Sequence, residues 1–229
     1  MVRSNALALA LMAAPAAAQL QPGETLLEVE AQGTVRSTPD LATFSVEVAS
    51  QGASSDAALQ ANARSADRLV SATLAAGASR GDLKTSDVRV APRYRQDADG
   101  DDTDEVIGYR ASERFEVRVP VARAGAMLDA LGKAGATEVS GPAFVFSDDG
   151  PLIRSARAKA VAEANNRADD YASALGLRRS RIIRVSERSA RRLENADIIV
   201  SGARAKGAPI IAGEQETSVT VWIDYALVK

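Results

Sequence analysis

Histidine and cysteine are both absent from this chain of 229 residues. Without them the protein cannot form a Ser-His-Asp or Cys-His relay, a thiolate nucleophile, a disulfide bond, an iron–sulfur cluster or a zinc site of His and Cys ligands. These absences remove most common designs of an active site. We therefore expect a protein that is not an enzyme, with no catalytic residues and no cofactor.

Net charge is also small, at -2, and the pI is near 5.4. Such a balance gives no general attraction to polyphosphate, so nucleic acid is not expected as a partner. The glycine motifs that cradle phosphate groups, G-x-G-x-x-G and G-x-x-x-x-G-K-S/T, do not occur. The remaining composition, 46% hydrophobic and 25% charged, is typical of a globular protein.

Long hydrophobic runs are missing as well. The apolar run at residues 6–14 falls short of the ~20 residues that span a bilayer. It follows the positive charge of Arg3 and precedes a row of small residues, Ala16 to Ala18, which is the pattern that signal peptidases cleave. We predict a signal peptide at residues 1–18 and export of the protein; an N-terminal helix or membrane anchor is the alternative.

Hydrophobic periodicity predicts a mixed fold, since alternation indicates strands and a period of 3.6 residues indicates helices. The turn residues Thr38-Pro39-Asp40 separate the first two strands. Strands are predicted around residues 27–31, 42–48, 88–94, 109–119, 144–146, 183–185 and 219–227. Helices are predicted over residues 54–76 and 122–133, and from a start within residues 148–151 to residue 175.

Each long helix has an apolar stripe that we expect to be buried. The first stripe is Leu59, Ala63, Ala66, Val70 and Leu74, and the second is Ile153, Ala156, Ala160, Ala164, Ala168, Tyr171 and Leu175. The order strand, helix, strand, strand occurs twice, which indicates an internal repeat of residues 40–120 and 138–229 within one domain of residues 19–229. Two unrelated halves are the alternative. The predicted class is α+β, with two β-α-β-β-like halves whose antiparallel sheet is covered on one face by long Ala-rich helices.

Arginines alternate with apolar residues along the central hairpin. If Val88, Val90, Tyr94, Tyr109, Phe115 and Val117 face the core, the opposite face carries Arg89, Arg93, Arg95, Arg110, Arg114 and Arg118, with mainly Glu116 to offset their charge. One interpretation is ion pairing with Glu28, Glu30 and Glu47 on the outward face of the first two strands. The other is docking of an acidic patch of another subunit, or of lipid phosphate.

An acidic tract joins the two strands of that hairpin. It consists of Asp97, Asp99, Asp101, Asp102, Asp104 and Glu105. The first five are candidate ligands for a hard cation such as Ca²⁺, but the tract lacks the Gly at position six and the Glu at position twelve of an EF-hand loop. We therefore expect a solvated hairpin tip that keeps the protein soluble rather than a metal site.

The C-terminal part contains two further candidates for surface contact. A basic run could meet anionic lipid, a partner subunit or solvent alone; it consists of Arg178, Arg179, Arg181, Arg184, Arg188, Arg191 and Arg192. The connection 193–216 is long for a loop, and we expect it to pack on its own sheet or on a neighbour's. The last strand buries alternate residues from Val219 to Leu227, which places Trp222 on the other face. Either the connection covers Trp222 or Trp222 anchors a contact between subunits.

Several short blocks together resemble the SIMPL-domain family, in the family's order from about residue 24 to the C-terminus. They lie at residues 33–35, 38–44, 83–87, 92–94, 108–112, 140–141, 160–162 and 208–210. The resemblance implies an α+β protein that is periplasmic or associated with the outer membrane. It also implies that some relatives assemble into large rings and that a role in oxidative or envelope stress has been suggested. The family provides no agreed catalytic residues.

Two functions follow from these observations. The first is that of a noncatalytic exported envelope protein which acts through self-assembly and surface contacts, with a homo-oligomer and the envelope as its expected partners. The alternative is a periplasmic binding module for an anionic small or lipidic ligand. In either case the candidate contact residues are Trp222, Arg89, Arg93, Arg110, Arg114 and Arg118.

Overall fold

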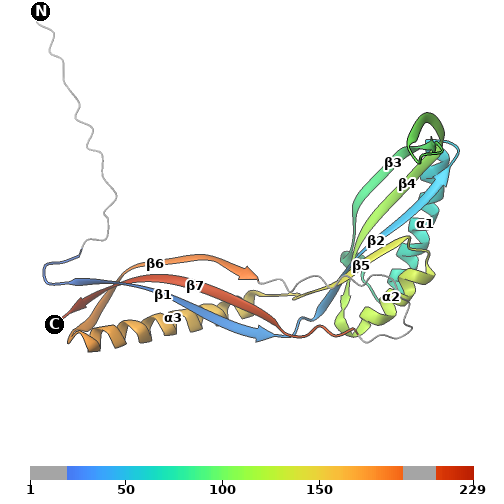
Figure 1. Ribbon diagram of the computed structural model, residues 1–229. Coiled ribbons are helices and arrows are strands. Elements are labelled where there is room, and N and C mark those ends of the chain that lie inside the picture. Colours follow the sequence, from blue (N-terminus) through green and yellow to red (C-terminus); the bar gives the residue numbers. More distant parts are fainter. Residues whose placement is uncertain (1–19, 193–209) are drawn as a thin grey trace, which may run out of the picture. The chain divides into compact units, whose positions relative to one another are not determined.

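The computed structural model describes residues 20–192 and 210–229, and the side chains in these ranges apart from those of residues 188–192 (Figure 1). The predicted signal peptide therefore lies outside the described residues. Among the helices that the structure describes, none is both long and apolar enough to cross a membrane. The elements are β1 (Thr25–Ser37), β2 (Leu41–Gly52), α1 (Ser55–Ala75), β3 (Leu83–Gln96), β4 (Asp102–Pro120), α2 (Ala124–Lys133), β5 (Glu138–Val145), α3 (Gly150–Ala174), β6 (Arg178–Arg192) and β7 (Gln215–Val228).

The described chain divides into two compact units. A three-stranded unit contains residues 20–35, 152–192 and 217–229, and its sheet has the order β1-β7-β6. A four-stranded unit contains residues 36–151 and 210–216, and its sheet has the order β3-β4-β2-β5. Long Ala-rich helices and antiparallel sheets confirm the α+β class. The division into an internal repeat stays a prediction.

The four-stranded unit has its core under β2 and β4. Alternation along β2 buries Ala42, Phe44, Val46 and Val48 completely, as predicted. The antiparallel register places Phe44 opposite Val117 of β4, so both strands present apolar residues to the same side. Helices α1 and α2 cover this side (Figure 1).

Helix α1 begins where predicted but turns a different face to the sheet. The Ser54 side chain accepts a hydrogen bond from the Ala57 N–H at 3.2 Å, which caps the first turn. The predicted stripe is offset by about one residue: Leu59 is 40% exposed and Ala63 is exposed, Ala66 is buried as predicted, and Val70 and Leu74 are half-buried. The buried residues are Ala58, Asn62, Ala66, Leu69 and Thr73. Asn62 explains the rotation, because its amide donates to the carbonyl oxygens of Val48 and Ala111 at 2.9 and 3.2 Å. A prediction that counts only apolar residues as buried cannot find a helix face that includes a buried amide.

In the three-stranded unit, α3 packs through alanines. Its buried residues are Ala156, Ala160, Ala164, Ala168 and Ala172, and they face Val29 and Ala31 of β1 and the predicted apolar face of β7. The end of the predicted stripe is wrong, since Tyr171 and Leu175 are exposed and Ala172 takes the buried position. Helix and strand approach closely here: a Cβ on Gly33 would lie 2.0 Å from the carbonyl oxygen of Ala156.

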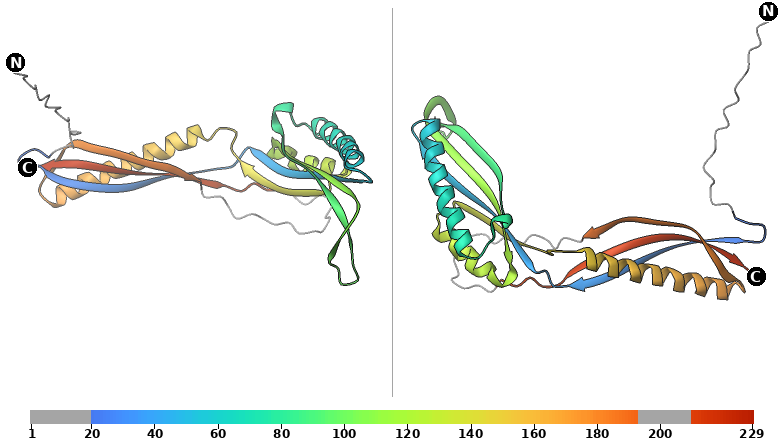
Figure 2. Two further views of the ribbon diagram at one scale, coloured as in Figure 1. Left: turned by 90° about the horizontal axis from the view of Figure 1, so that it is seen from above. Right: turned by 180° about the vertical axis from the view of Figure 1, so that it is seen from behind.

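Strand β3 corrects a further expectation, because none of its residues is buried. The register places Val90 opposite the buried Ala111, so it does face the helix side, yet Val88 is 58% exposed and Val90 and Tyr94 are exposed as well. Helix α1 packs mainly on β2 and β4 and leaves this edge strand uncovered. Beyond Gly52, where β2 ends opposite Tyr109, β3 and β4 continue as a two-stranded ribbon (Figure 2).

Candidate functional site

Five arginines share the face of the four-stranded sheet that points away from α1 and α2. Phe115 and Val117 of β4 point into the core, so their neighbours Arg114 and Arg118 point to the opposite side. We call this surface the arginine face; it consists of Arg89, Arg93, Arg110, Arg114 and Arg118. The register pairs Arg114 with Glu47 and Asp87, and Arg110 with Gln51.

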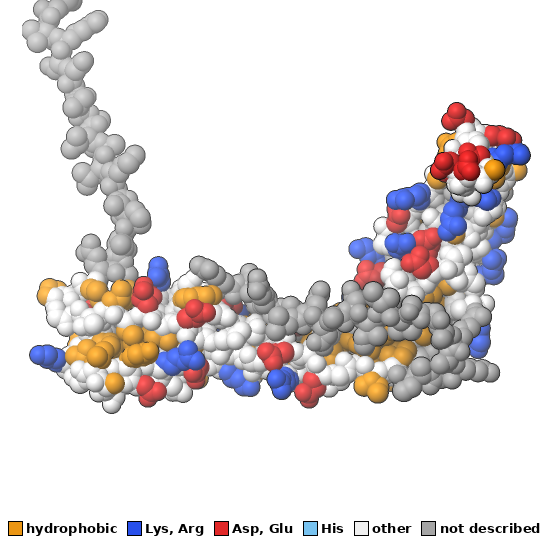
Figure 3. Space-filling view, viewed as in Figure 1, with side chains coloured by type: hydrophobic (Ala, Val, Ile, Leu, Met, Phe, Trp, Pro, Cys, Tyr) orange, Lys and Arg blue, Asp and Glu red, His pale blue; other side chains and the backbone are white. Residues whose placement is uncertain are grey.

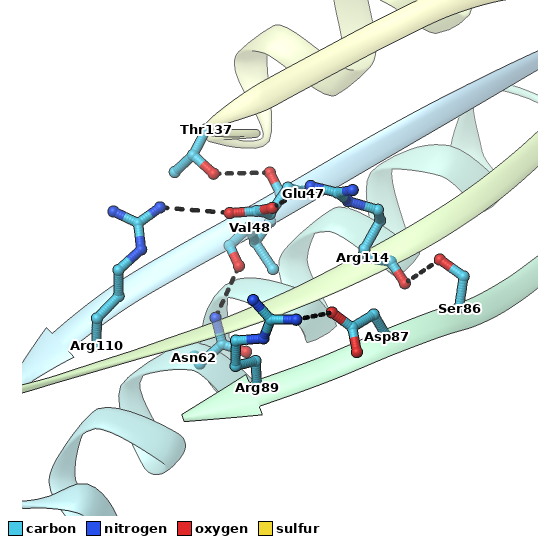
Figure 4. Close-up of polar contacts among 9 residues, drawn as sticks. All are labelled: Glu47, Val48, Asn62, Ser86, Asp87, Arg89, Arg110, Arg114 and Thr137. Atoms are coloured by element: carbon cyan, nitrogen blue, oxygen red, sulfur yellow. Dashed lines mark hydrogen bonds and ion pairs between the residues drawn. The ribbon is translucent and has the colours of Figure 1, made fainter. Parts of the chain in front are cut away.

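Glu47 is the centre of this surface (Figure 4). Its carboxylate accepts hydrogen bonds from Arg114 at 2.6 Å and from Arg110 at 3.3 Å, and its side chain is only 15% exposed. The backbone carbonyl of Glu47 also accepts the Thr137 hydroxyl at 2.9 Å, which fixes the strand. The bond from Arg114 holds the pKa of Glu47 below its usual value; burial acts in the opposite direction, and the bond from Arg110 adds to the lowering.

The other arginines of this face have weaker partners. Arg89 lies 4.0 Å from Asp87, and Arg93 donates to the neutral side-chain amide of Gln51. Within the described part of the chain, no ion pair is formed by Arg118. Of the three acidic partners expected from the sequence, Glu47 is here, whereas Glu28 and Glu30 lie on β1 in the other sheet, where Glu28 is 4.0 Å from Arg184.

The acidic tract forms the tip of the β3–β4 hairpin, as predicted. The Asp97 carboxylate accepts the backbone N–H groups of Asp99 and Asp101, both at 3.0 Å, and Gly100 adopts a positive φ of 90° that closes the turn. Arg95 forms an ion pair with Glu105 at 2.8 Å. Among the described residues, no three acidic side chains are grouped so that they could hold a metal ion.

The basic run on β6 is largely paired with carboxylates of its own unit. Arg179 contacts Asp169 at 2.9 Å, Arg181 contacts Glu24 at 2.9 Å, and Arg184 contacts Asp224 at 2.8 Å. Opposite charge is thus supplied by α3, by Glu24 just before β1, and by β7; the pairs with Glu24 and Asp224 join parts of the chain that are far apart in the sequence. The side chains of Arg188, Arg191 and Arg192 lie outside the description.

A shallow groove that the sequence did not point to follows the flank of α3. Its volume is about 510 Å³, and it is lined by Arg154, Arg157, Ala158, Val161, Ala162 and Asn165. Strand β6 runs beside it, since Arg157 pairs with Glu187 at 2.6 Å and Asn165 accepts hydrogen bonds from Arg179 and from Tyr225, the latter at 3.0 Å. The only trace of this groove in the sequence is a second row of small and apolar residues on α3, next to the buried alanines. A sequence pattern alone does not distinguish such a row from a solvated helix face.

Trp222 lies on the face of β7 expected for it. Its neighbours Val221 and Ile223 are buried toward α3, and Trp222 itself is partly buried opposite Ser186 of β6. Its role in a contact between subunits stays a prediction.

Most of the connection 193–216 lies outside the described residues. At its described end, Ile210 packs on the core of the four-stranded unit, and the side-chain amide of Gln215 donates to the Phe144 carbonyl at 2.8 Å.

Comparison with known proteins places this geometry in a family. Residues 27–225 match the model of the SIMPL family, described as a protein of unknown function (DUF541). The chain belongs to the SIMPL family. The SIMPL match begins in β1 and ends in β7, so it includes both units. Two relatives, both named 26 kDa periplasmic immunogenic protein, come from Brucella melitensis biotype 1 and Brucella abortus strain S19; each is 27% identical over 204 residues, covering 85% of this chain and 82% of the relative.

Proposed function

We propose that this SIMPL protein is exported to the periplasm and acts there without catalysis, through self-assembly and surface contacts. The predicted signal peptide and the periplasmic names of the Brucella relatives support the compartment. The absence of His and Cys from the sequence supports the lack of catalysis. Contact with the outer membrane and a part in envelope stress belong to the same proposal.

The ribbon at the end of the β3–β4 hairpin carries this proposal. Val106 and Ile107 are 46% and 47% exposed there, and Tyr94 is also exposed. A two-stranded ribbon without a third strand is marginally stable in water, and its exposed apolar area is costly. Contact with a second copy would bury these side chains, so the ribbon has the features of an assembly arm.

Light scattering on the mature chain tests the proposal. At tens of micromolar we expect a particle of several subunits, and Val106→Ser with Ile107→Ser should reduce its mass. The matched control is Leu59→Ser, which removes a similarly exposed apolar side chain from α1 and should leave the mass unchanged. A wild-type chain that is monomeric at this concentration would contradict self-assembly.

A second candidate function, binding of an anionic amphiphile, is favoured by the groove along α3. The groove is shallow and is lined by α3 alone, so it suits an extended apolar chain lying along the helix rather than an enclosed ligand. Ile182 and Val185 of the neighbouring strand are 50% and 56% exposed, and Arg154 offers a cation at the lining. Native mass spectrometry of protein purified gently from the periplasm should then show a retained fatty acid or single-chain lipid, and Val161→Glu should remove it. Protein that is always recovered without adduct contradicts this function.

A further inference from the structure

The β3–β4 hairpin carries opposite charges at its two ends. Acidic side chains gather at its tip, while basic side chains lie among acidic ones along the strands at its base (Figure 3). The tip carries Asp97, Asp99, Asp101, Asp102, Asp104 and Glu105, of which Glu105 is paired with Arg95. The base carries the arginine face.

The two ends cannot neutralise each other within one molecule. Arg93 lies three residues before the end of β3 at Gln96, which is about 10 Å of strand at ~3.3 Å per residue, and Asp99 lies farther out, in the turn. Both belong to the same antiparallel ribbon, so the tip cannot fold back onto its own base. At physiological ionic strength, charges this far apart are screened from each other, because the Debye length is about 8 Å.

The guanidinium groups of the arginine face can donate more hydrogen bonds than their carboxylate partners on this face accept. Glu47 is one carboxylate shared by two arginines, Arg110 and Arg114. Arg93 is bound to a neutral amide, and the 4.0 Å contact of Arg89 with Asp87 leaves most of the Arg89 side chain exposed. A guanidinium binds a carboxylate best through two parallel hydrogen bonds, and the exposed side chains of Arg89 and Arg93 leave room for such partners.

We propose that the arginine face, at Arg89 and Arg93, receives the acidic tip of the β3–β4 hairpin of a second copy of this chain. The inference rests on the proposed self-assembly and specifies its contact. Each copy has one tip and one face, so the same contact can repeat from copy to copy around a ring or occur twice in a two-fold pair. Charge complementarity selects the occupant, since the tip is the matching acidic surface that every copy already carries.

The first test neutralises each surface separately. The tip variant is Asp99→Asn, Asp102→Asn and Asp104→Asn; Asp97 is kept because its carboxylate holds the turn. The face variant is Arg89→Gln with Arg93→Gln, and Arg110 and Arg114 are kept because they hold Glu47. Each variant should associate at least tenfold more weakly than wild type in light scattering.

Matched controls change the same charges elsewhere. They are Asp67→Asn, Asp129→Asn and Asp170→Asn for the tip, and Arg64→Gln with Arg178→Gln for the face; all five residues are exposed. Both controls should assemble as wild type does. Circular dichroism of every variant should keep the mixed helix and strand signal, which shows that a lower mass does not come from unfolding.

The deciding test mixes the two variants. The tip variant keeps an intact face and the face variant keeps an intact tip, so the mixture should contain a 1:1 pair that neither variant forms alone. If wild type assembles and either variant keeps the wild-type mass, or if the mixture stays monomeric, this contact is wrong while self-assembly stands. If wild type is monomeric, self-assembly itself is wrong.

Flotation with phosphatidylglycerol vesicles tests lipid phosphate as the other occupant of the arginine face. If wild type binds the vesicles and the face variant does not, while the face variant still assembles as wild type does, the surface binds lipid phosphate instead.

Discussion

The two units of this SIMPL protein build their cores from side chains of different size. In the four-stranded unit, Phe44, Met127 and Leu131 are fully buried between the sheet and two helices. In the three-stranded unit, α3 contributes only alanines to its fully buried row, and the larger side chains come from the sheet. Gly33 lets the backbone of β1 approach α3 as closely as this packing requires.

The difference teaches which substitution each unit tolerates. A core of large side chains loses most when atoms are removed, because a cavity remains. A core that depends on close approach of a helix to a sheet loses most when atoms are added, because backbone must move. Large-to-small substitutions should therefore destabilise the four-stranded unit most, and small-to-large substitutions should destabilise the three-stranded unit most.

The largest effect is expected from Phe44→Ala in the four-stranded unit. Removing this fully buried ring should lower the free energy of unfolding by about 3–5 kcal/mol. Urea unfolding followed by hydrogen exchange of each unit measures the loss. The control Tyr94→Ala removes an exposed aromatic ring from the same sheet and should cost little. Equal costs would show that Phe44 is not part of a packed core.

Ala164→Leu should have the next largest effect, in the three-stranded unit. Ala164 is fully buried, so three additional carbons should overpack the interface and cost about 1–3 kcal/mol. Ala158→Leu on the exposed side of the same helix is the control, since Leu and Ala have similar helix propensity. An unchanged urea midpoint for Ala164→Leu would refute the close approach of α3 to the sheet.

A smaller loss of stability is expected from Asn62→Ala. Asn62 of α1 is buried and Asn166 of α3 is exposed, so the two variants compare a buried with an exposed side-chain amide. Asn62 donates to two backbone carbonyls of its sheet, and their loss should cost about 1–2 kcal/mol. Asn166 of α3 is exposed, so Asn166→Ala should change stability much less. If the two variants unfold at the same urea concentration, the rotation of α1 is not set by Asn62.

The sequence predicted burial well for β2 and β7 and for the edge strand β1, where Val29 and Ala31 are buried, but poorly for the edge strand β3. Alternation is reliable for β2 and β7, because each has a neighbour on both sides and a helix above one face. The same alternation misled for β3, since an edge strand can keep its apolar residues on the correct side and still lack a helix to cover them. Periodicity reports the direction of a side chain, whereas burial depends on which element lies over it.

The sequence predicted which arginines share the arginine face, but it predicted only some of the carboxylates that pair with them. Alternation alone places Arg110, Arg114 and Arg118 on one face, and Glu47 was among the expected partners. Glu28 and Glu30 were assigned to the same surface because all outward strand faces look alike in a sequence. The partners of the β6 arginines come from elements up to 157 residues away, as for Arg181 and Glu24, so only tertiary structure reveals them.

The smallest effect concerns pH and again compares the two units. The pKa of Glu47 is lowered by hydrogen bonds from Arg114 and Arg110, and the pKa of Glu24 is lowered mainly by its hydrogen bond from Arg181. A carboxyl group whose pKa is lower in the folded state contributes stability that is present above its unfolded pKa and is lost as pH falls through the folded value. Acid should therefore weaken both units through these two groups.

Glu47→Gln tests this in the four-stranded unit, because the amide cannot titrate. The wild-type urea midpoint of that unit should fall more between pH 7 and pH 4 than the midpoint of Glu47→Gln does, and the difference should be small because both arginines are substantially exposed to solvent. Glu214→Gln, an exposed carboxylate of the same unit, is the control and should follow the wild-type pH dependence. The three-stranded unit still contains Glu24 in this variant, so its own response to acid should persist. If Glu47→Gln loses as much stability on acidification as wild type, the two arginines do not act on the folded state through this carboxylate.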